Sequence, residues 1–337
     1  MANSPTEKRS TVLVLKCLNE LKQVAMVFYR KLLAATSNIG LKRSSADPCL
    51  YFKWAEGQLI IMISWIDDNM ILGPSDLVMQ VKEDLMKQFD CDDCGRLEEY
   101  VGNKIEYVSN DAIRFVQTVL MQSYSDKFEL GKRCYNTPAQ PGRGSDEASQ
   151  RQQTIEQQGA VNIEVRHCSR PDISQAAQDL AHHMTRGDQT HMEAMLRCMQ
   201  YLRGTKDVGL LLKPERKWDG NDSFLFKITG ISDSDYAKDT QTMRSITGYV
   251  VYIKGVPVMH QSATQKTVAL SLCEAELNAA VLCVQDMIYG KNLLESIGLK
   301  VKLSMVLQIT NKGAVDLINS FSVGGRTRHI DVKQCFL

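Results

Sequence analysis

The fold of the last third of the chain is decided by three β-rich runs, which read FLFKITGISDSDYA (residues 224–237), SITGYVVYIKG (245–255) and VPVMHQSA (256–263). A long helical pattern follows over Cys273–Ser296 and stops at Gly298. A strand over 303–310 and a helix over 313–321 complete the series. Three strands, a helix, a strand and a helix predict one compact α/β domain over residues 223–337.

The sequence before this domain also predicts a mixture of helices and strands. Apolar residues recur at helical spacing over 18–33, and Gly40 is expected to end that helix. A turn is expected at Glu56 and Gly57, and Ser75 is expected to cap the next helix. Further helices are predicted over 75–89, 117–130, 174–183 and 189–203, and strands over 49–54, 58–66, 69–72, 100–107 and 112–116.

Two breaks in composition predict the domain organisation. Residues 136–160 are polar and rich in Gly, Pro, Ser and Gln, which is typical of a linker or an exposed loop. Residues 214–222 predict a second boundary. We therefore expect three segments, which are 1–135, a linker and helical connection over 136–222, and 223–337.

Composition limits the classes of function. The chain has 337 residues, with 40 Lys and Arg against 39 Asp and Glu. This balance excludes a polycationic nucleic-acid coat but is compatible with a local basic groove. No run reaches the ~18 apolar residues that span a bilayer, so we expect no membrane partner. The polar N-terminus and ten cysteines predict an intracellular protein with reduced thiols, with cytoplasm and nucleus both left open.

Two short motifs each allow two interpretations. Asp67 and Asp68 directly follow an apolar strand, where paired carboxylates fit either a divalent cation such as Mg²⁺ or an acidic hairpin turn. Cys91 and Cys94 form a single C-x-x-C, which fits either a zinc site or an acidic loop with two thiols.

The last domain carries separated carboxylates. Asp233 and Asp235 lie on its first predicted strand, Glu274 and Glu276 lie in the first turn of its long helix, and Asp331 lies near the C-terminus. The helix dipole alone favours acidic residues in a first turn. Carboxylates on a strand, a helix and a tail are also what a two-metal phosphodiesterase site needs. Spacing alone does not show that they converge.

Several motifs follow one another in a specific order along the chain. They are LNELKQVAMVFYRKLL (18–33), SSADPCLY (44–51), SWIDDNMILG (64–73), YVGNKIEY (100–107), SRPDIS (169–174), MQYLRGTKDVGLLL (199–212), SDSDYAKDTQTMRSITGYVVYIKGVPV (232–258), QKTVALSLCEAELNAA (265–280) and RTRHIDV (326–332). In this order they resemble the reverse transcriptase and ribonuclease H region of Ty1/copia-type retrotransposon polyproteins. The chain looks like a truncated, degenerate copy of that region.

The resemblance implies a fold and a chemistry. The fold would be α/β (α+β), with a partial reverse transcriptase palm and thumb followed by a ribonuclease H-like mixed-sheet domain. The partners would be a primer–template or an RNA–DNA hybrid, and the cofactor would be Mg²⁺ or Mn²⁺. The implied catalytic and metal-holding residues are Asp67 and Asp68 in the palm, and Asp233, Glu276 and Asp331 in the nuclease. The implied nucleic-acid contacts are Gly102, Arg326, Arg328 and His329, although His329 and the two arginines also fit an ordinary basic surface.

Two departures from the family limit the expected activity. The first palm aspartate would precede the first residue of this chain, and Thr310 stands where the nuclease has a further carboxylate. A neutral hydroxyl is a poor Mg²⁺ ligand and removes one charge from the site. We therefore expect a fragment whose polymerase activity is lost and whose nuclease is impaired. The alternative is a catalytically dead remnant that at most binds nucleic acid.

Overall fold

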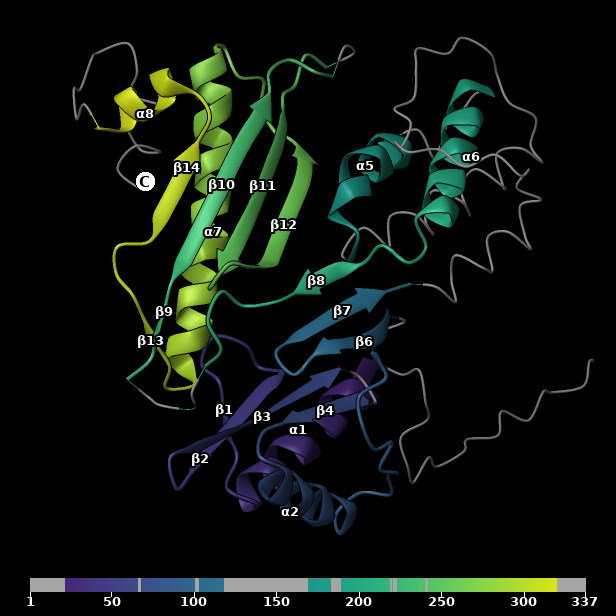
Figure 1. Cartoon of the computed structure of the whole chain (residues 1–337), viewed down its shortest axis with the longest axis vertical. Helices are drawn as coiled ribbons and strands as arrows, with labels where there is room; N and C mark the ends of the chain where they lie inside the picture. The colour runs from purple at the N-terminus through teal and green to yellow at the C-terminus, as the bar shows by residue number, and fades with distance from the viewer. Residues whose placement is uncertain are drawn as a thin grey trace, which may run out of the picture. The chain divides into compact units, whose positions relative to one another are not determined.

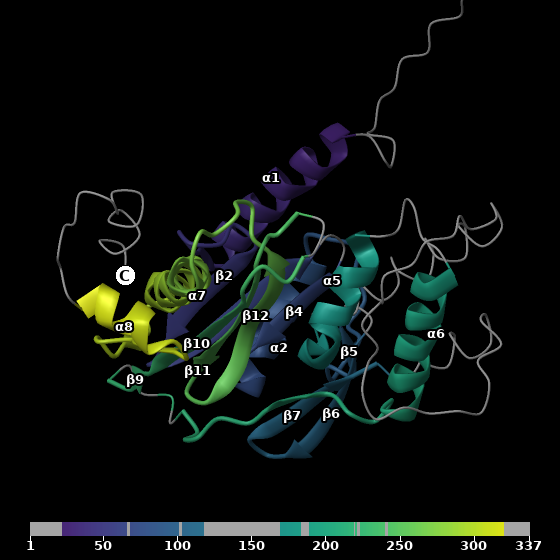
Figure 2. The same cartoon turned by 90° about the horizontal axis from the view of Figure 1, so that it is seen from above.

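The computed structural model covers the whole chain and describes residues 22–65, 68–100, 103–117, 169–182, 189–218, 220, 223–239 and 242–319. The chain is a mixed α/β protein with two compact units, Met1–Cys94 and Gly95–Leu337 (Figures 1 and 2). The predicted boundaries after residues 135 and 222 both fall inside the second unit, and they stay predictions. Among the described helices, none is both long and apolar enough to cross a membrane.

The first unit is a four-stranded antiparallel sheet, in the order β1-β2-β3-β4, with two helices packed against it. The central position predicted for the apolar strand β3 is confirmed, because β3 pairs with β2 on one side and β4 on the other. Tyr51, Ile60 and Met62 of the sheet are almost fully buried against Leu32 of α1 and Val81 of α2. The elements are α1 (Lys22–Asn38), β1 (Lys42–Arg43), β2 (Leu50–Ala55), β3 (Gln58–Trp65), β4 (Asp68–Leu72) and α2 (Ser75–Met86).

Backbone chemistry explains where these elements begin and end. Glu56 and Gly57 have positive φ values of 51° and 75°, so the predicted turn between β2 and β3 is confirmed. The prediction that Ser75 caps α2 is wrong, because Ser75 is already helical and Pro74 precedes it with an extended ψ of 139°. Proline has no N–H and a fixed φ, so it occupies the boundary without a side-chain cap.

The second unit begins with another antiparallel sheet, in the order β5-β6-β7-β8. Its last strand, β8, comes from the segment predicted as a linker and connection, and no strand was predicted there. A Cβ at Gly209 would lie 2.0 Å from the carbonyl oxygen of Phe115, so only glycine allows the chain to approach β7 this closely. The strands are β5 (Glu99–Tyr100), β6 (Asn103–Ser109), β7 (Ala112–Val116) and β8 (Leu210–Leu212).

Two helices precede β8 and confirm the helices predicted over 174–183 and 189–203. They are α5 (Ser174–His182) and α6 (Gln189–Gly204), and the short helix η2 (Pro171–Ile173) leads into α5. Gln178 joins α5 to strand β12, because its Nε2 donates to Thr264 Oγ1 at 2.9 Å and its Oε1 accepts from Ser262 Oγ at 3.2 Å. The helical connection therefore lies against the edge of the next sheet.

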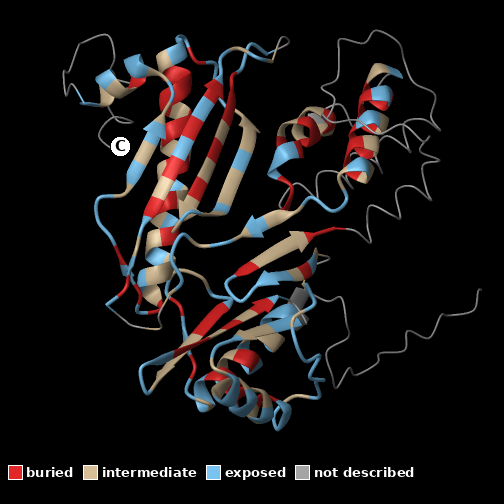
Figure 3. Cartoon of the chain, viewed as in Figure 1, coloured by how far each residue is buried: buried red, intermediate tan, exposed pale blue. Residues whose placement is uncertain are grey.

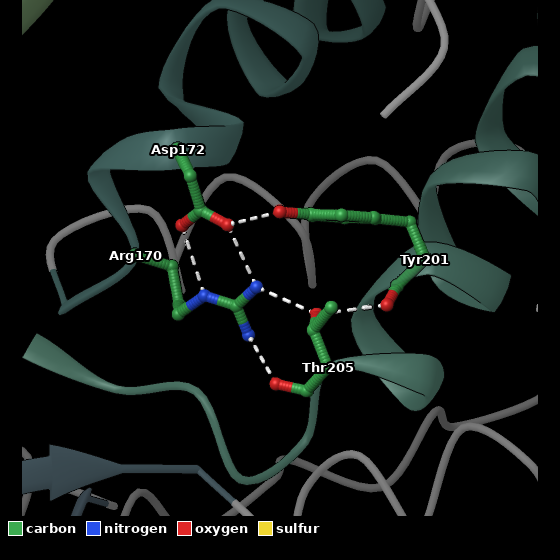
Figure 4. Close-up of polar contacts among 4 residues, drawn as sticks. All are labelled: Arg170, Asp172, Tyr201 and Thr205. Atoms are coloured by element: carbon green, nitrogen blue, oxygen red, sulfur yellow. Dashed lines mark hydrogen bonds and ion pairs between the residues drawn. The ribbon is translucent and has the colours of Figure 1, made fainter. Parts of the chain in front are cut away.

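An ion pair between the buried Arg170 and the more exposed Asp172 ties the start of this connection to the end of α6 (Figure 4). Arg170 is 2% exposed, and its Nε and Nη2 donate to the two carboxylate oxygens of Asp172 at 2.9 and 2.7 Å. The Tyr201 hydroxyl donates to the same carboxylate at 2.7 Å, and the guanidinium also donates to Thr205. Burial alone would raise the pKa of Asp172, but these hydrogen bonds lower it overall.

The remainder of the second unit is a mixed sheet in the order β12-β11-β10-β14, with α7 lying along it (Figure 1). The strands β10, β11 and β12 are antiparallel neighbours, and β14 pairs with β10 in parallel. The predicted order of strands and helices is confirmed with two exceptions: the first run is divided into β9 and β10, and the short strand β13 after α7 was not predicted. The elements are β9 (Leu225–Phe226), β10 (Ile228–Asp235), β11 (Ile246–Ile253), β12 (Val256–Thr264), α7 (Leu272–Ser296), β13 (Lys300–Val301), β14 (Val306–Ile309) and α8 (Lys312–Asn319).

Helix α7 lies unusually close to β10 at Gly230. A Cβ at this position would lie 2.6 Å from both Cys283 Sγ and Met287 Sδ of the helix. Both of these side chains are at most 1% exposed, and they belong to one apolar cluster with Ile228 and Val251. Figure 3 shows buried positions along both the helix α7 and the strand β10. The absence of a side chain on Gly230 is therefore what allows α7 to pack at this depth.

We expect Gly230→Ala to lower the free energy of unfolding by roughly 1–3 kcal/mol, because the added methyl overpacks a closed core. Gly248→Ala on the neighbouring strand is the matched control, since the nearest atom to its added Cβ would be 4.0 Å away. Denaturant unfolding followed by circular dichroism measures both variants. Equal destabilisation by the two substitutions would contradict the proposed contact.

Candidate functional site

Asp233 lies near the C-terminal end of β10, on the exposed face of the strand. Its neighbours Ser232 and Ser234 are 1% and 8% exposed and point to the opposite, covered face. The parallel register with β14 sets Ser232 opposite Ile309, so the residue after each of them also comes close. Sheet pairing alone therefore brings Asp233 beside Thr310, although 77 positions separate them in the sequence.

Thr310 contacts this carboxylate directly. Its hydroxyl donates a hydrogen bond to Asp233 Oδ1 at 2.8 Å. The resemblance placed Thr310 where a further nuclease carboxylate is expected, and its side chain indeed reaches the first one. At this position the chain offers Asp233 a neutral hydrogen-bond donor instead of a second negative charge.

Glu276 approaches the same place from helix α7. The prediction that it lies in the first turn of the helix is wrong, because α7 begins at Leu272 and Glu276 falls in the second turn, where it is 3% exposed. Its Oε2 is buried and has no hydrogen-bond partner among the described residues. The Glu276 carboxyl group also forms hydrogen bonds with Ser234 and Asp233, so Oε2 is the oxygen that is available to a further ligand.

The two carboxylates interact electrostatically. Burial and the nearby charge of Asp233 raise the pKa of Glu276 to about 7. Like charges at close range and low exposure both disfavour the ionised form, whereas a bound cation would favour it. This interaction means that the Asp233 and Glu276 carboxyl groups lie near each other, which the spacing of the two residues in the sequence did not show.

A buried amide network holds the start of α7 in place. Gln265 is 5% exposed, and its Nε2 donates to the Ala275 carbonyl at 2.9 Å and to Thr247 Oγ1 at 3.2 Å. Its Oε1 accepts from Asn278 Nδ2 at 2.9 Å. No role was assigned to Gln265 from the sequence. Its position as the first residue of the motif over 265–280 was the one feature that could have indicated a role. By binding the carbonyl next to Glu276, it positions that side chain.

The other two carboxylates of this region have structural partners. Glu274 Oε2 accepts from the Leu270 N–H at 2.8 Å, and its own N–H donates to the Ser271 Oγ cap at 3.2 Å. Asp235 forms an ion pair with Lys238 at 3.0 Å on the surface. These contacts favour the interpretation of Glu274 as a helix-terminus residue.

Several predicted site residues lie outside the described residues, namely Asp67, Gly102, Asp331, His329, Arg326 and Arg328. Asp68 is described as the first residue of β4, where it is exposed and paired with Trp65. Cys91 and Cys94 are exposed free thiols. Within the described ranges, no three His, Cys, Asp or Glu side chains gather closely enough to hold a metal ion.

The raised pKa of Glu276 has a consequence for stability. Between its ordinary value near 4.5 and about 7, ionisation increasingly opposes folding, so the penalty is absent at acid pH and complete above pH 7. In a chelator, we expect Glu276→Gln to raise the free energy of unfolding at pH 8 by on the order of 3 kcal/mol, with little effect at pH 4.5.

Thermal unfolding at both pH values measures this difference. Glu295→Gln on the same helix is the control, because Glu295 is exposed and paired with Lys291 at 2.8 Å. A Glu276→Gln variant that is no more stable than the parent at pH 8 would contradict the account.

Comparisons with known proteins identify the family of the chain. Residues 3–141 match the family described as reverse transcriptase (RNA-dependent DNA polymerase). The retrovirus-related Pol polyprotein from transposon TNT 1-94 of Nicotiana tabacum is 30% identical over 335 residues, which cover 94% of this chain and 24% of the relative. The Pol polyproteins from transposons RE1 and RE2 of Arabidopsis thaliana are 26% and 25% identical, over 96% of this chain and 22% of each relative.

The chain thus spans about a quarter of the length of these curated relatives. No solved structure matches it significantly. The family match and the colinear similarity to the three plant polyproteins identify the chain as a reverse transcriptase region of the copia-type retrotransposon family.

Proposed function

We propose that the mixed sheet and α7 form a ribonuclease H-like nuclease that acts on the RNA strand of an RNA–DNA hybrid, with reduced activity. The observation that carries this proposal is the meeting of Asp233, Glu276 and Thr310 at one end of the sheet. The reverse transcriptase family acts on nucleic-acid templates, which supports a nucleic acid as the partner.

The topology supports the same proposal. The resemblance implied carboxylates on the first strand and on the long helix, and a further one after the strand that follows the helix. Asp233 on β10 and Glu276 on α7 occupy the first two places, and Thr310 directly follows β14 in the third. These positions become neighbours through the parallel pairing of β10 with β14 and the packing of α7 on β10.

The donor set fits a divalent cation. Asp233 and Glu276 offer carboxylate oxygens, which Mg²⁺ and Mn²⁺ prefer, and the buried Oε2 of Glu276 is free to bind. When bound, such a cation would activate water and stabilise the leaving oxygen of the phosphodiester. The protein would contribute a fixed pair of negative charges and would hold Asp233 in place through Thr310.

Thr310 is the reason to expect reduced activity. Its hydroxyl uses one lone pair of Asp233 Oδ1 and adds no negative charge. The site therefore carries less charge to attract cations than one with a carboxylate at this position. The same observation favours the alternative function, which is nucleic-acid binding without cleavage.

We expect Thr310→Asp to increase the Mg²⁺-dependent cleavage of a labelled RNA–DNA hybrid by about 100-fold or more, because it restores a charged ligand. Thr310→Ser keeps the hydroxyl and is the matched control, so its rate should stay near that of the parent. Glu276→Gln should abolish the cleavage in both backgrounds.

Gel analysis of single-turnover reactions measures these rates. If the folded Thr310→Asp variant cleaves no faster than the parent, the nuclease proposal fails. Hybrid binding without cleavage by every variant would support the alternative.

A further inference from the structure

Cationic side chains gather at the opposite end of β10 from Asp233. Strands β9 and β13 pair in parallel beside the start of β10, with Lys300 opposite Leu225, and Lys302 N–H donates to the Phe226 carbonyl at 2.9 Å (Figure 1). Lys300 and Lys302 are exposed, whereas Val301 between them is 8% exposed. Lys227, directly after β9, is exposed as well.

Two more cationic side chains lie nearby, and both pack over the same aromatic ring. Lys254 Nζ lies 4.4 Å and Arg216 Cζ lies 5.5 Å from the centroid of Phe224, which is itself 7% exposed. The backbone N–H of Lys254 donates to the Lys227 carbonyl at 2.9 Å, so the two lysines are adjacent. We call Arg216, Lys227, Lys254, Lys300 and Lys302 the basic patch.

Four of the five cations of this patch are not neutralised by an ion pair with another described residue. Within the part of the chain that the structure describes, Arg216, Lys227, Lys254 and Lys302 form no ion pair. A carboxylate does lie nearby, because the Glu215 side chain packs over Gly255. Like charges on neighbouring strands lower the stability of the folded chain. The cluster of cations therefore does not serve folding, and we attribute it to the binding of a polyanion.

Lys227, directly before β10, and Asp233 near the end of that strand lie on the same exposed side of it. Exposure alternates from Lys227 through the fully buried Ile228 to the exposed Ile231 and Asp233. Six residues of strand span about 20 Å, which corresponds to about six phosphates of one nucleic-acid strand. A strand that reaches the carboxylates could therefore reach the basic patch at the same time.

We propose that the basic patch binds the phosphodiester backbone of a nucleic acid whose bound strand extends along β10 to Asp233. Phe224 lies beneath Lys254 and Arg216 and is too buried to stack on bases. The patch therefore contacts phosphates and does not read the base sequence. The inference rests on the proposed function for the identity of the polyanion. The atoms that would bind it are the cations of the basic patch, not the carboxylates of the proposed nuclease site.

The test compares binding of fluorescently labelled RNA–DNA hybrids to the full chain by anisotropy at several salt concentrations, in Ca²⁺ to prevent cleavage. We expect Lys227→Glu with Lys302→Glu to weaken binding of a 16-base-pair hybrid by at least about tenfold, and to reduce the slope of log affinity against log salt by about 2.

The matched control carries the same charge change at Lys87 and Lys104, which are exposed and already lie near Asp84 and Glu106. Lys227→Gln with Lys302→Gln serves as a milder pair if the charge reversal unfolds the chain. Equal losses in patch and control variants, or no binding by the parent, would overturn the inference. If the parent chain binds the hybrid without ever cleaving it, and the patch variant loses this binding, the nuclease proposal is rejected and the inference about the basic patch stands.

Discussion

The close packing of α7 on Gly230 is the constraint on which the C-terminal part of the structure depends. A helix that lay further from the sheet would carry Glu276 away from Asp233, because the two residues belong to different elements and meet only through this packing. The contact of Gly230 with Cys283 and Met287 sets the distance between helix and strand. Gln265 then fixes the start of the helix by binding the Ala275 carbonyl. Apolar packing and one buried amide together place a charged side chain.

The site that results is unfavourable for the folded chain on its own. The buried carboxyl group of Glu276 lies beside the exposed carboxylate of Asp233, and one oxygen of Glu276 has no partner among the described residues. Such an arrangement lowers stability unless a cation neutralises it. Thr310 lessens the problem, since it donates a hydrogen bond to Asp233 where another carboxylate would add repulsion. The substitution that weakens the proposed chemistry therefore also relieves electrostatic strain, which is the usual opposition between stability and activity.

Sequence reasoning was most successful for features encoded by neighbouring residues. Apolar periodicity located β3, α7 and the order of elements around them, and the turn at Glu56 and Gly57 followed from local conformational preference. It failed at Ser75, because a proline at the boundary replaced the expected cap. It also missed β8, because three residues paired with a distant strand leave no periodic signal. The candidate site follows the same rule. The residue types could be predicted, whereas the hydrogen bond from Thr310 and the role of Gln265 depend on contacts between distant segments.

The central claim is that Asp233 and Glu276 form one cation site. It is tested most directly by isothermal titration calorimetry with Mn²⁺, on a full chain in which Asp67→Asn and Asp68→Asn remove the palm carboxylates. The account predicts that this protein binds Mn²⁺ and that adding Asp233→Asn weakens the binding by at least about tenfold. Mn²⁺ binding of equal affinity with and without Asp233→Asn, or no binding by the folded protein, would contradict it.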